Sequence, residues 1–247
     1  MRALLVFLPL VLFGCGSSDS GGTPPTTDTD SGTVADTAPA DTKEAGGTSC
    51  TSARETAIGP VDKVSGGIVK VIDDTAGVKT VFIDATAGGI SGGKTNPWVY
   101  VKLATGTRAD LTDKQAFDSA EWDLALKRPI IHTNSGDAGP GNGGAKIVSK
   151  AFDAVTLADA TGLKVETWFD AECTPLTDPT GSVKTTFDGW YAYDDATMKV
   201  TPKDLTIVVR AANGDLYKLA ITTYYGSVSG GTSVAGANYI VKYAALK

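Results

Sequence analysis

The sequence predicts an all-β domain of antiparallel strands, arranged as a sandwich or as a barrel-like pair of sheets. From Gly67 to the end of the chain, apolar and polar residues alternate with a period of two, in segments rich in Val, Ile, Thr and aromatic residues. Paired glycines separate these segments where turns are needed, and long stretches with helical periodicity are scarce. We expect one such domain over residues 50–247, which is long enough to bury a sizeable core.

The expected strands follow one another with turn residues between them. The first two, 68–72 and 80–84, flank Thr75-Ala76-Gly77 as a hairpin, and Asn213-Gly214-Asp215 is a strong hairpin signal after 205–210. One or two helical turns are expected at 114–120, whereas 146–152 fits either a helix or a strand. The remaining strands are expected at 98–103, 122–134, 155–157, 189–193, 216–225 and 238–244.

Residues 1–14 are expected to be an export signal and not part of the fold. The uncharged run that ends at Phe13 has about a dozen residues, fewer than the roughly 20 that span a bilayer. Leu12-Phe13-Gly14-Cys15 resembles the lipobox of bacterial lipoproteins. The resemblance implies cleavage before Cys15, with a diacylglycerol on its sulfur and an acyl chain such as palmitate on the new amino terminus. The alternative is an ordinary secretory peptide with an incidental cysteine.

Residues 15–49 are expected to carry the lipidated cysteine and a disordered linker. Val34 is the only large apolar side chain from Gly16 to Ser49, too little to offset the entropy of ordering the segment. Six acidic residues here account for most of the formal net charge of −6, and 20 basic and 22 acidic residues remain from Cys50 onward. The charge therefore indicates no particular partner, and a basic face for nucleic acid is not expected. Because no acidic pair follows Cys15, we expect the cell envelope, and the outer membrane within it.

Three cysteines occur, and the lipid takes the first. Cys50 and Cys173 remain as an even pair in an oxidising compartment, for which a disulfide is expected. A thiol nucleophile or a metal ligand is the alternative, but neither cysteine has a neighbouring histidine.

His132 is the only histidine, which excludes multi-histidine metal sites. A Ser-His-Asp arrangement would have to use it, and the chain has no nucleophile elbow. We therefore expect no enzyme. The alternative for His132 is a strand residue that is solvated or hydrogen-bonded to a neighbour.

Two other patterns are formally present. Gly139, Gly141 and Gly144 match a dinucleotide-binding loop, but Pro140 removes an amide and the surrounding chain reads as strands. Asp28, Asp30 and Asp36 lack the glycine and glutamate of a calcium loop.

The second half of the domain is rich in aromatic residues. In the strand 189–193, Trp190 faces one side, and Tyr191 and Tyr193 face the other. These rings could line a pocket for a flat ligand or a sugar, although packing in the core is the commoner use of such residues.

Two segments resemble the HmuY family of bacterial surface lipoproteins, over roughly residue 98 to the end. The first has the pattern W-D-[IL]-A-[FL], then T-N-S-G, then G-x-G-G-A, and the second has G-W-Y-x-Y, V-x-P, R, G, Y-K-L and Y-Y. The matching residues are Trp122-Asp123-Leu124-Ala125-Leu126, Thr133-Asn134-Ser135-Gly136, Gly141-Asn142-Gly143-Gly144-Ala145, Gly189-Trp190-Tyr191-Ala192-Tyr193, Val200-Thr201-Pro202, Arg210, Gly214, Tyr217-Lys218-Leu219 and Tyr224-Tyr225.

The resemblance implies an all-β, HmuY-like fold and a haemophore, since the namesake holds haem between two axial histidines. This chain departs from that pattern, because bis-histidine ligation is impossible with His132 alone. Met198 falls near where the second motif can place an axial ligand, and a thioether can ligate haem iron. Met198 and His132 are thus the candidate metal ligands. Arg210, or Lys199, is the candidate partner of the haem propionates.

We therefore expect a lipid-anchored, non-enzymatic ligand-binding protein that takes haem or another porphyrin-like ligand. Its expected partners are the membrane, through the lipid, and haem or a host haem protein. A carbohydrate-binding or adhesion module, using Trp190, Tyr191 and Tyr193, is one alternative, and a structural surface lipoprotein without a small ligand is another.

Overall fold

The computed structural model describes residues 50–178 and 181–247. The expected signal peptide, Cys15 and the linker lie outside these residues. The helices are α1 (Thr51–Ile58), α2 (Gly89–Gly92) and α3 (Asp113–Ala116). The strands are β1 (Val69–Thr75), β2 (Val78–Asp84), β3 (Val99–Lys102), β4 (Thr107–Ala109), β5 (Leu124–Lys127), β6 (Ile130–Thr133), β7 (Gly144–Val148), β8 (Tyr191–Asp194), β9 (Lys199–Pro202), β10 (Thr206–Arg210), β11 (Leu216–Thr223) and β12 (Asn238–Ala245).

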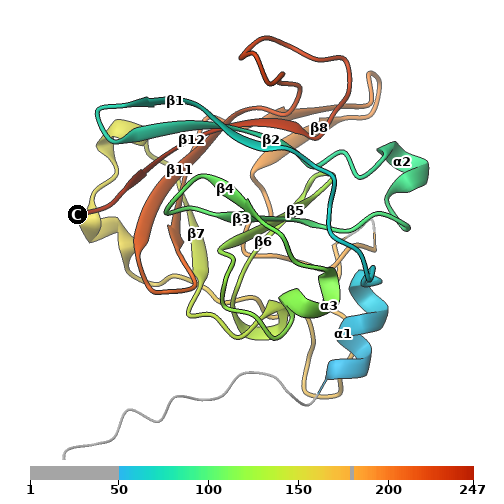
Figure 1. Ribbon diagram of the computed structural model, residues 1–247. Coiled ribbons are helices and arrows are strands. Elements are labelled where there is room, and N and C mark those ends of the chain that lie inside the picture. The colour runs from blue at the N-terminus through green and yellow to red at the C-terminus, as the bar shows by residue number, and fades with distance from the viewer. Residues whose placement is uncertain (1–49, 179–180) are drawn as a thin grey trace, which may run out of the picture. The chain divides into compact units, whose positions relative to one another are not determined.

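Two antiparallel sheets and a separate hairpin make up the domain (Figure 1). The larger sheet has six strands in the order β1-β2-β12-β11-β10-β7, and the smaller has four in the order β4-β3-β5-β6. Strands β8 and β9 pair only with each other among the described residues. The all-β prediction, with antiparallel strands in a sandwich-like pair of sheets, is confirmed.

The core between the two sheets follows from alternation along the strands. In the larger sheet, Val81 and Ile83 of β2 and Val241 of β12 face inward. In the smaller sheet, Val101 of β3 and Leu126 of β5 face them from the other side. Both sets belong to one buried cluster, so each sheet covers the apolar face of the other.

The smaller sheet is also buried on its outer face. There, Tyr100, Ala125 and Trp122 belong to a second cluster with Trp168 and Phe169, which come from a later segment of the chain. A sheet covered on both faces needs apolar residues at consecutive positions, and Leu124, Ala125 and Leu126 of β5 are consecutive and all buried.

The Cys50–Cys173 disulfide joins the start of the domain to the segment that covers this second cluster. It links residues 123 positions apart. The expected pairing of these two cysteines is therefore confirmed.

Several elements differ from expectation. Residues 155–157 do not form a strand, because Thr156 and Asp159 form a capping box at the 3-10 helix Leu157–Ala160. Helix α1 was not expected; it buries no residue fully and ends at Gly59 in a left-handed conformation. The expected hairpin turn at Ala76-Gly77 is present, with φ of 53° and 78°. Within the described part of the chain, no helix has the length and apolar character needed to cross a membrane.

Candidate functional site

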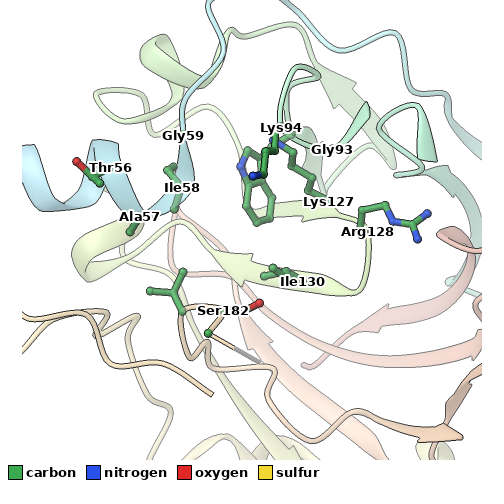
Figure 2. A pocket seen from close by; sticks show the side chains of 13 residues that line it. Thr56, Ala57, Ile58, Gly59, Gly93, Lys94, Lys127, Arg128, Ile130 and Ser182 are labelled. Atoms are coloured by element: carbon green, nitrogen blue, oxygen red, sulfur yellow. The ribbon is translucent and has the colours of Figure 1, made fainter. Parts of the chain in front are cut away.

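A cavity of about 470 Å³ lies where α1, the end of β5 and the start of β6 meet (Figure 2). Its size falls in the range of pockets that take small organic ligands. Apolar walls come from Ala57 and Ile58 of α1, Ile130 of β6 and Val183. We call this space the α1 cavity. The other residues that line it are Thr56, Gly59, Gly93, Lys94, Trp98, Lys127, Arg128, Gly181 and Ser182.

Three of these lining residues are cationic and none is acidic. Lys94 follows α2, Lys127 ends β5, and Arg128 begins the turn to β6. Within the described part of the chain, none of the three has a salt-bridge partner. The α1 cavity therefore favours an anionic ligand.

Lys127 is the most enclosed of the three cations, with 8 % of its surface exposed. Its Nζ lies 5.7 Å from the centroid of the Trp98 ring, within the range of a cation–π contact. Burial lowers the pKa of Lys127, and the negative charge of Asp113 opposes that effect. A carboxylate in the cavity would stabilise the charged form of Lys127.

The turn that carries Arg128 is held from both sides. Arg128 has a φ of 54°, its amide donates to the Ala85 carbonyl at 2.9 Å, and its carbonyl accepts from the Tyr239 hydroxyl at 2.6 Å. In Figure 2 its guanidinium extends away from Lys127. Arg128 therefore marks the rim of the cavity, while Lys94 and Lys127 form its cationic wall.

A smaller cavity of about 150 Å³ adjoins the first and shares Ile130, Ser182 and Val183 with it. Its other walls include Trp190, Tyr191 and two carboxylates, those of Asp178 and Asp188. Burial, and then these two carboxylates, raise the pKa of Tyr191. Acidic side chains thus line the smaller cavity and not the α1 cavity.

His132 lies beneath the α1 cavity, packed against tryptophans of the second cluster, with 2 % of its surface exposed. The rings of Trp98, Trp168 and Trp122 surround it edge to face, with centroids 4.7, 5.0 and 5.5 Å away. Neither ring nitrogen has a hydrogen-bond partner within the described residues. Burial lowers the pKa of His132 to about 3, although the Thr133 backbone slightly favours the charged form. His132 is therefore a neutral core residue in this structure.

Met198 does not line the α1 cavity. It sits in the loop of the β8–β9 hairpin with a φ of 53° and is 75 % exposed. Tyr193, on the same hairpin, is 52 % exposed, and neither residue lines either cavity. The structure does not bring Met198 together with His132.

The other two aromatic candidates are divided between core and cavity. Trp190 is buried between the sheets and donates to the Pro129 carbonyl at 3.0 Å. Tyr191 packs against it, with ring centroids 4.8 Å apart, and lines the smaller cavity. Of the expected ligand-binding residues, Trp190 and Tyr191 are thus the ones beside a cavity.

Arg210 lies at the opposite end of the larger sheet from the β8–β9 hairpin. It pairs with Leu216 at the start of β11. The β8–β9 hairpin meets the other end of β11, where the hydroxyl of Tyr225, just beyond that strand, accepts a hydrogen bond from the Val200 amide at 3.1 Å. The Arg210 guanidinium donates to the carbonyls of Asn142 and Gly143. Arg210 therefore holds the glycine-rich loop and does not face Met198.

The T-N-S-G motif and the glycine-rich loop are joined by hydrogen bonds to Asn134 and do not form a nucleotide site. The Asn134 side chain donates to the carbonyls of Ser119 and Trp122 and accepts from the Gly141 amide at 3.0 Å. A Cβ on Gly139 or Gly143 would collide with Asn134. The glycines therefore serve the close approach of two backbones.

The sequence reasoning missed Lys94, Lys127 and Trp98 as site residues. Lys127 carried one signal: it is the single charged residue in the otherwise apolar strand Leu124–Lys127. Lys94 carried none, because α2 brings it to the cavity from a distant part of the chain. No group of three His, Cys, Asp or Glu side chains that could hold a metal occurs in residues 50–178 and 181–247.

Comparisons with known proteins give one family match. The model of the family described as HmuY protein matches residues 94–239. No match was found among curated proteins.

Similar solved structures include an apo HmuY analogue of Tannerella forsythia, with 18 % identity, coverage of 75 % of this chain and 100 % of that one, and a TM-score of 0.45. A Bacteroides vulgatus protein described as HmuY-like and heme-binding has 18 % identity, coverage of 72 % and 96 %, and a TM-score of 0.46. A Bacteroides fragilis protein described as a lipoprotein has 17 % identity, coverage of 71 % and 94 %, and a TM-score of 0.44. The family match spans more than half of the chain, so the assignment rests on it.

Proposed function

The chain belongs to the HmuY family, and from that premise we propose that it is a non-enzymatic binding protein of the cell surface for a haem-like tetrapyrrole. The observation that carries the proposal is the α1 cavity, which combines apolar walls with a cationic side and has no acidic lining residue. A tetrapyrrole such as haem has the matching chemistry: a flat apolar ring with two carboxylates at one edge.

The ring and its carboxylates fit this site. Ile58, Ile130 and Val183 offer apolar contacts to a ring, and Lys94 and Lys127 offer ammonium groups to carboxylates. The carboxylates of Asp178 and Asp188 would repel the acidic edge of the ligand from the smaller cavity, which fixes its orientation.

The iron of haem fits less well. The lining of the α1 cavity contains no His, Met, Cys or Tyr among the described residues. His132 is enclosed by tryptophan rings, and Met198 is exposed on a separate hairpin. The proposed binding mode therefore uses no bond between the iron and the protein.

Titration of the folded domain with haemin tests the proposed function. We expect saturable binding that quenches tryptophan fluorescence, since Trp98 lines the cavity. Lys94→Met should weaken binding by about tenfold, the loss of one charged contact worth about 1.4 kcal/mol. Lys203→Met, at an exposed residue outside the cavity, is the matched control and should bind like the parent. Absence of binding, or equal binding by both variants, would refute the assignment.

The anchor is proposed on the lipobox-like sequence that ends at Cys15. In bacteria fed a fatty-acid label, the parent protein should carry the label in the outer-membrane fraction, whereas Cys15→Ser should not. A labelled Cys15→Ser protein would contradict the lipid site. A labelled parent protein in the inner membrane would contradict only the proposed location.

A further inference from the structure

The two lysines and the apolar walls of the α1 cavity point to a recognition mode that does not use the metal. We infer that the cavity selects the acidic ring itself, so that the metal-free tetrapyrrole binds about as tightly as haem. This inference rests on the proposed function and specifies its ligand class: a planar apolar dicarboxylate, with or without a metal.

The first argument is the distribution of side chains that could ligate iron. In the described part of the chain, the candidates are His132, Met198 and the tyrosines. To reach the cavity, His132 would have to leave its place against Trp98, Trp122 and Trp168 and break three edge-to-face ring contacts. Met198 is exposed on the β8–β9 hairpin and lines neither cavity. An iron–protein bond would therefore require rearrangement of a packed core or of the hairpin.

Among these candidates, Tyr191 lines the smaller cavity that adjoins the α1 cavity. A tyrosine binds ferric iron as the phenolate, the deprotonated form. Burial and the negative charges of Asp178 and Asp188 disfavour that form. The surroundings of Tyr191 thus oppose the one ligation that its position would allow.

The second argument is what the cavity does offer. Lys94 and Lys127 carry charges that no salt bridge within the described residues neutralises. The Trp98 ring lies in the lining, beneath the Lys127 ammonium. These groups would contact the carboxylate edge and the face of a tetrapyrrole ring and would not contact a metal at its centre. Affinity should therefore depend on the carboxylates and not on the metal.

Parallel titrations of the whole domain with haemin, protoporphyrin IX and protoporphyrin IX dimethyl ester test the inference. We expect the Kd values for haemin and protoporphyrin IX to agree within about threefold, and the ester, which lacks the charges, to bind at least about tenfold more weakly. Lys94→Met and Lys127→Met should weaken both acidic rings in the same proportion. Met198→Ala, Tyr191→Phe and His132→Phe should leave the affinity for haemin within about twofold of the parent.

The outcomes separate the inference from the proposed function. Haemin that binds at least about tenfold more tightly than protoporphyrin IX, and loses this advantage in Met198→Ala, Tyr191→Phe or His132→Phe, would overturn the inference and leave the proposed function standing. An ester that binds as tightly as the free acid would overturn the role of the lysines. Failure of both acidic rings to bind would overturn the proposed function, and the inference with it.

Discussion

Replacing His132 by phenylalanine should change how stability depends on pH. The imidazole is enclosed by Trp98, Trp122 and Trp168, and its pKa falls to about 3 in the folded chain, against 6.5 for the unperturbed group. The unfolded state therefore binds a proton in a range where the folded state does not. The stability that neutral His132 supports is complete above pH 6.5 and is lost as the pH falls towards 3.

The magnitude follows from the two pKa values. Each pH unit below 6.5 costs the folded state about 1.4 kcal/mol, so about 2.7 kcal/mol is lost at pH 4.5 and close to 5 kcal/mol near pH 3. Phenylalanine fills a similar volume and cannot take up the proton. At pH 7.5 we expect the two proteins to differ by less than about 2 kcal/mol.

Other buried groups titrate in the opposite sense, which decides how the experiment is designed. Burial raises the pKa of Asp113, Asp123 and Glu166, so the folded state binds protons more readily at these carboxylates. Their contribution to stability decreases as the pH rises through the interval between the unfolded and folded pKa values. Because both proteins carry them, the difference between the parent and His132→Phe isolates the histidine.

Urea unfolding at pH 7.5 and at pH 4.5, on the disulfide-intact domain, measures this difference. We expect His132→Phe to gain about 2.7 kcal/mol relative to the parent between the two pH values. A His132→Leu variant should show the same gain, which excludes a particular effect of the new ring. An unchanged difference at the two pH values would refute the buried, neutral state of His132.

Three further changes test the frame around the site. Reducing the Cys50–Cys173 bond, or replacing both cysteines by serine, should lower the free energy of unfolding by about 4 to 5 kcal/mol, because the bond closes a long loop. A change below about 1 kcal/mol in urea unfolding would contradict this. Asn134→Ala removes three hydrogen bonds and should lower the free energy of unfolding by about 3 kcal/mol, seen as a lower thermal midpoint. An unchanged midpoint would show that these hydrogen bonds do not stabilise the fold. Gly143→Ala should lower the free energy of unfolding by about 1 to 3 kcal/mol, because the new Cβ clashes with Asn134. Gly66→Ala is the control: its Cβ would meet nothing, so the free energy of unfolding should change by less than about 0.5 kcal/mol. Equal effects of the two substitutions would argue against a clash.

Much of the fold could be predicted because the strands carry local signals. The alternation in β2 and β12 and the turn residues Ala76-Gly77 are read directly from the sequence. Short elements escaped prediction: β4 has three residues, too few for a pattern, and α1 lacks a strongly apolar face. The capping box at Thr156 and Asp159 was a local signal that the strand assignment overlooked.

The site was harder to predict because its parts are distant in the sequence. Lys94 and Lys127 line the same cavity although they are distant in the sequence, and no spacing rule links them. The burial of His132 depends on Trp168, which arrives with a segment that follows β7 by many residues. A strand pattern indicates that His132 alternates with Ile131, but it cannot reveal that both faces of that strand are covered.

The disulfide also decides how the domain would carry a mechanical load applied from its amino-terminal side. Cys50 precedes α1 directly, so a pull on it passes through the sulfur bridge to Cys173. The force thereby bypasses α1, which buries no residue fully and would unravel easily. With the bridge closed, tension reaches the cover of the second cluster while the wall that α1 gives the cavity stays unloaded. With the bridge open, the same tension would unfold α1 first, and the cavity would lose the wall that α1 provides.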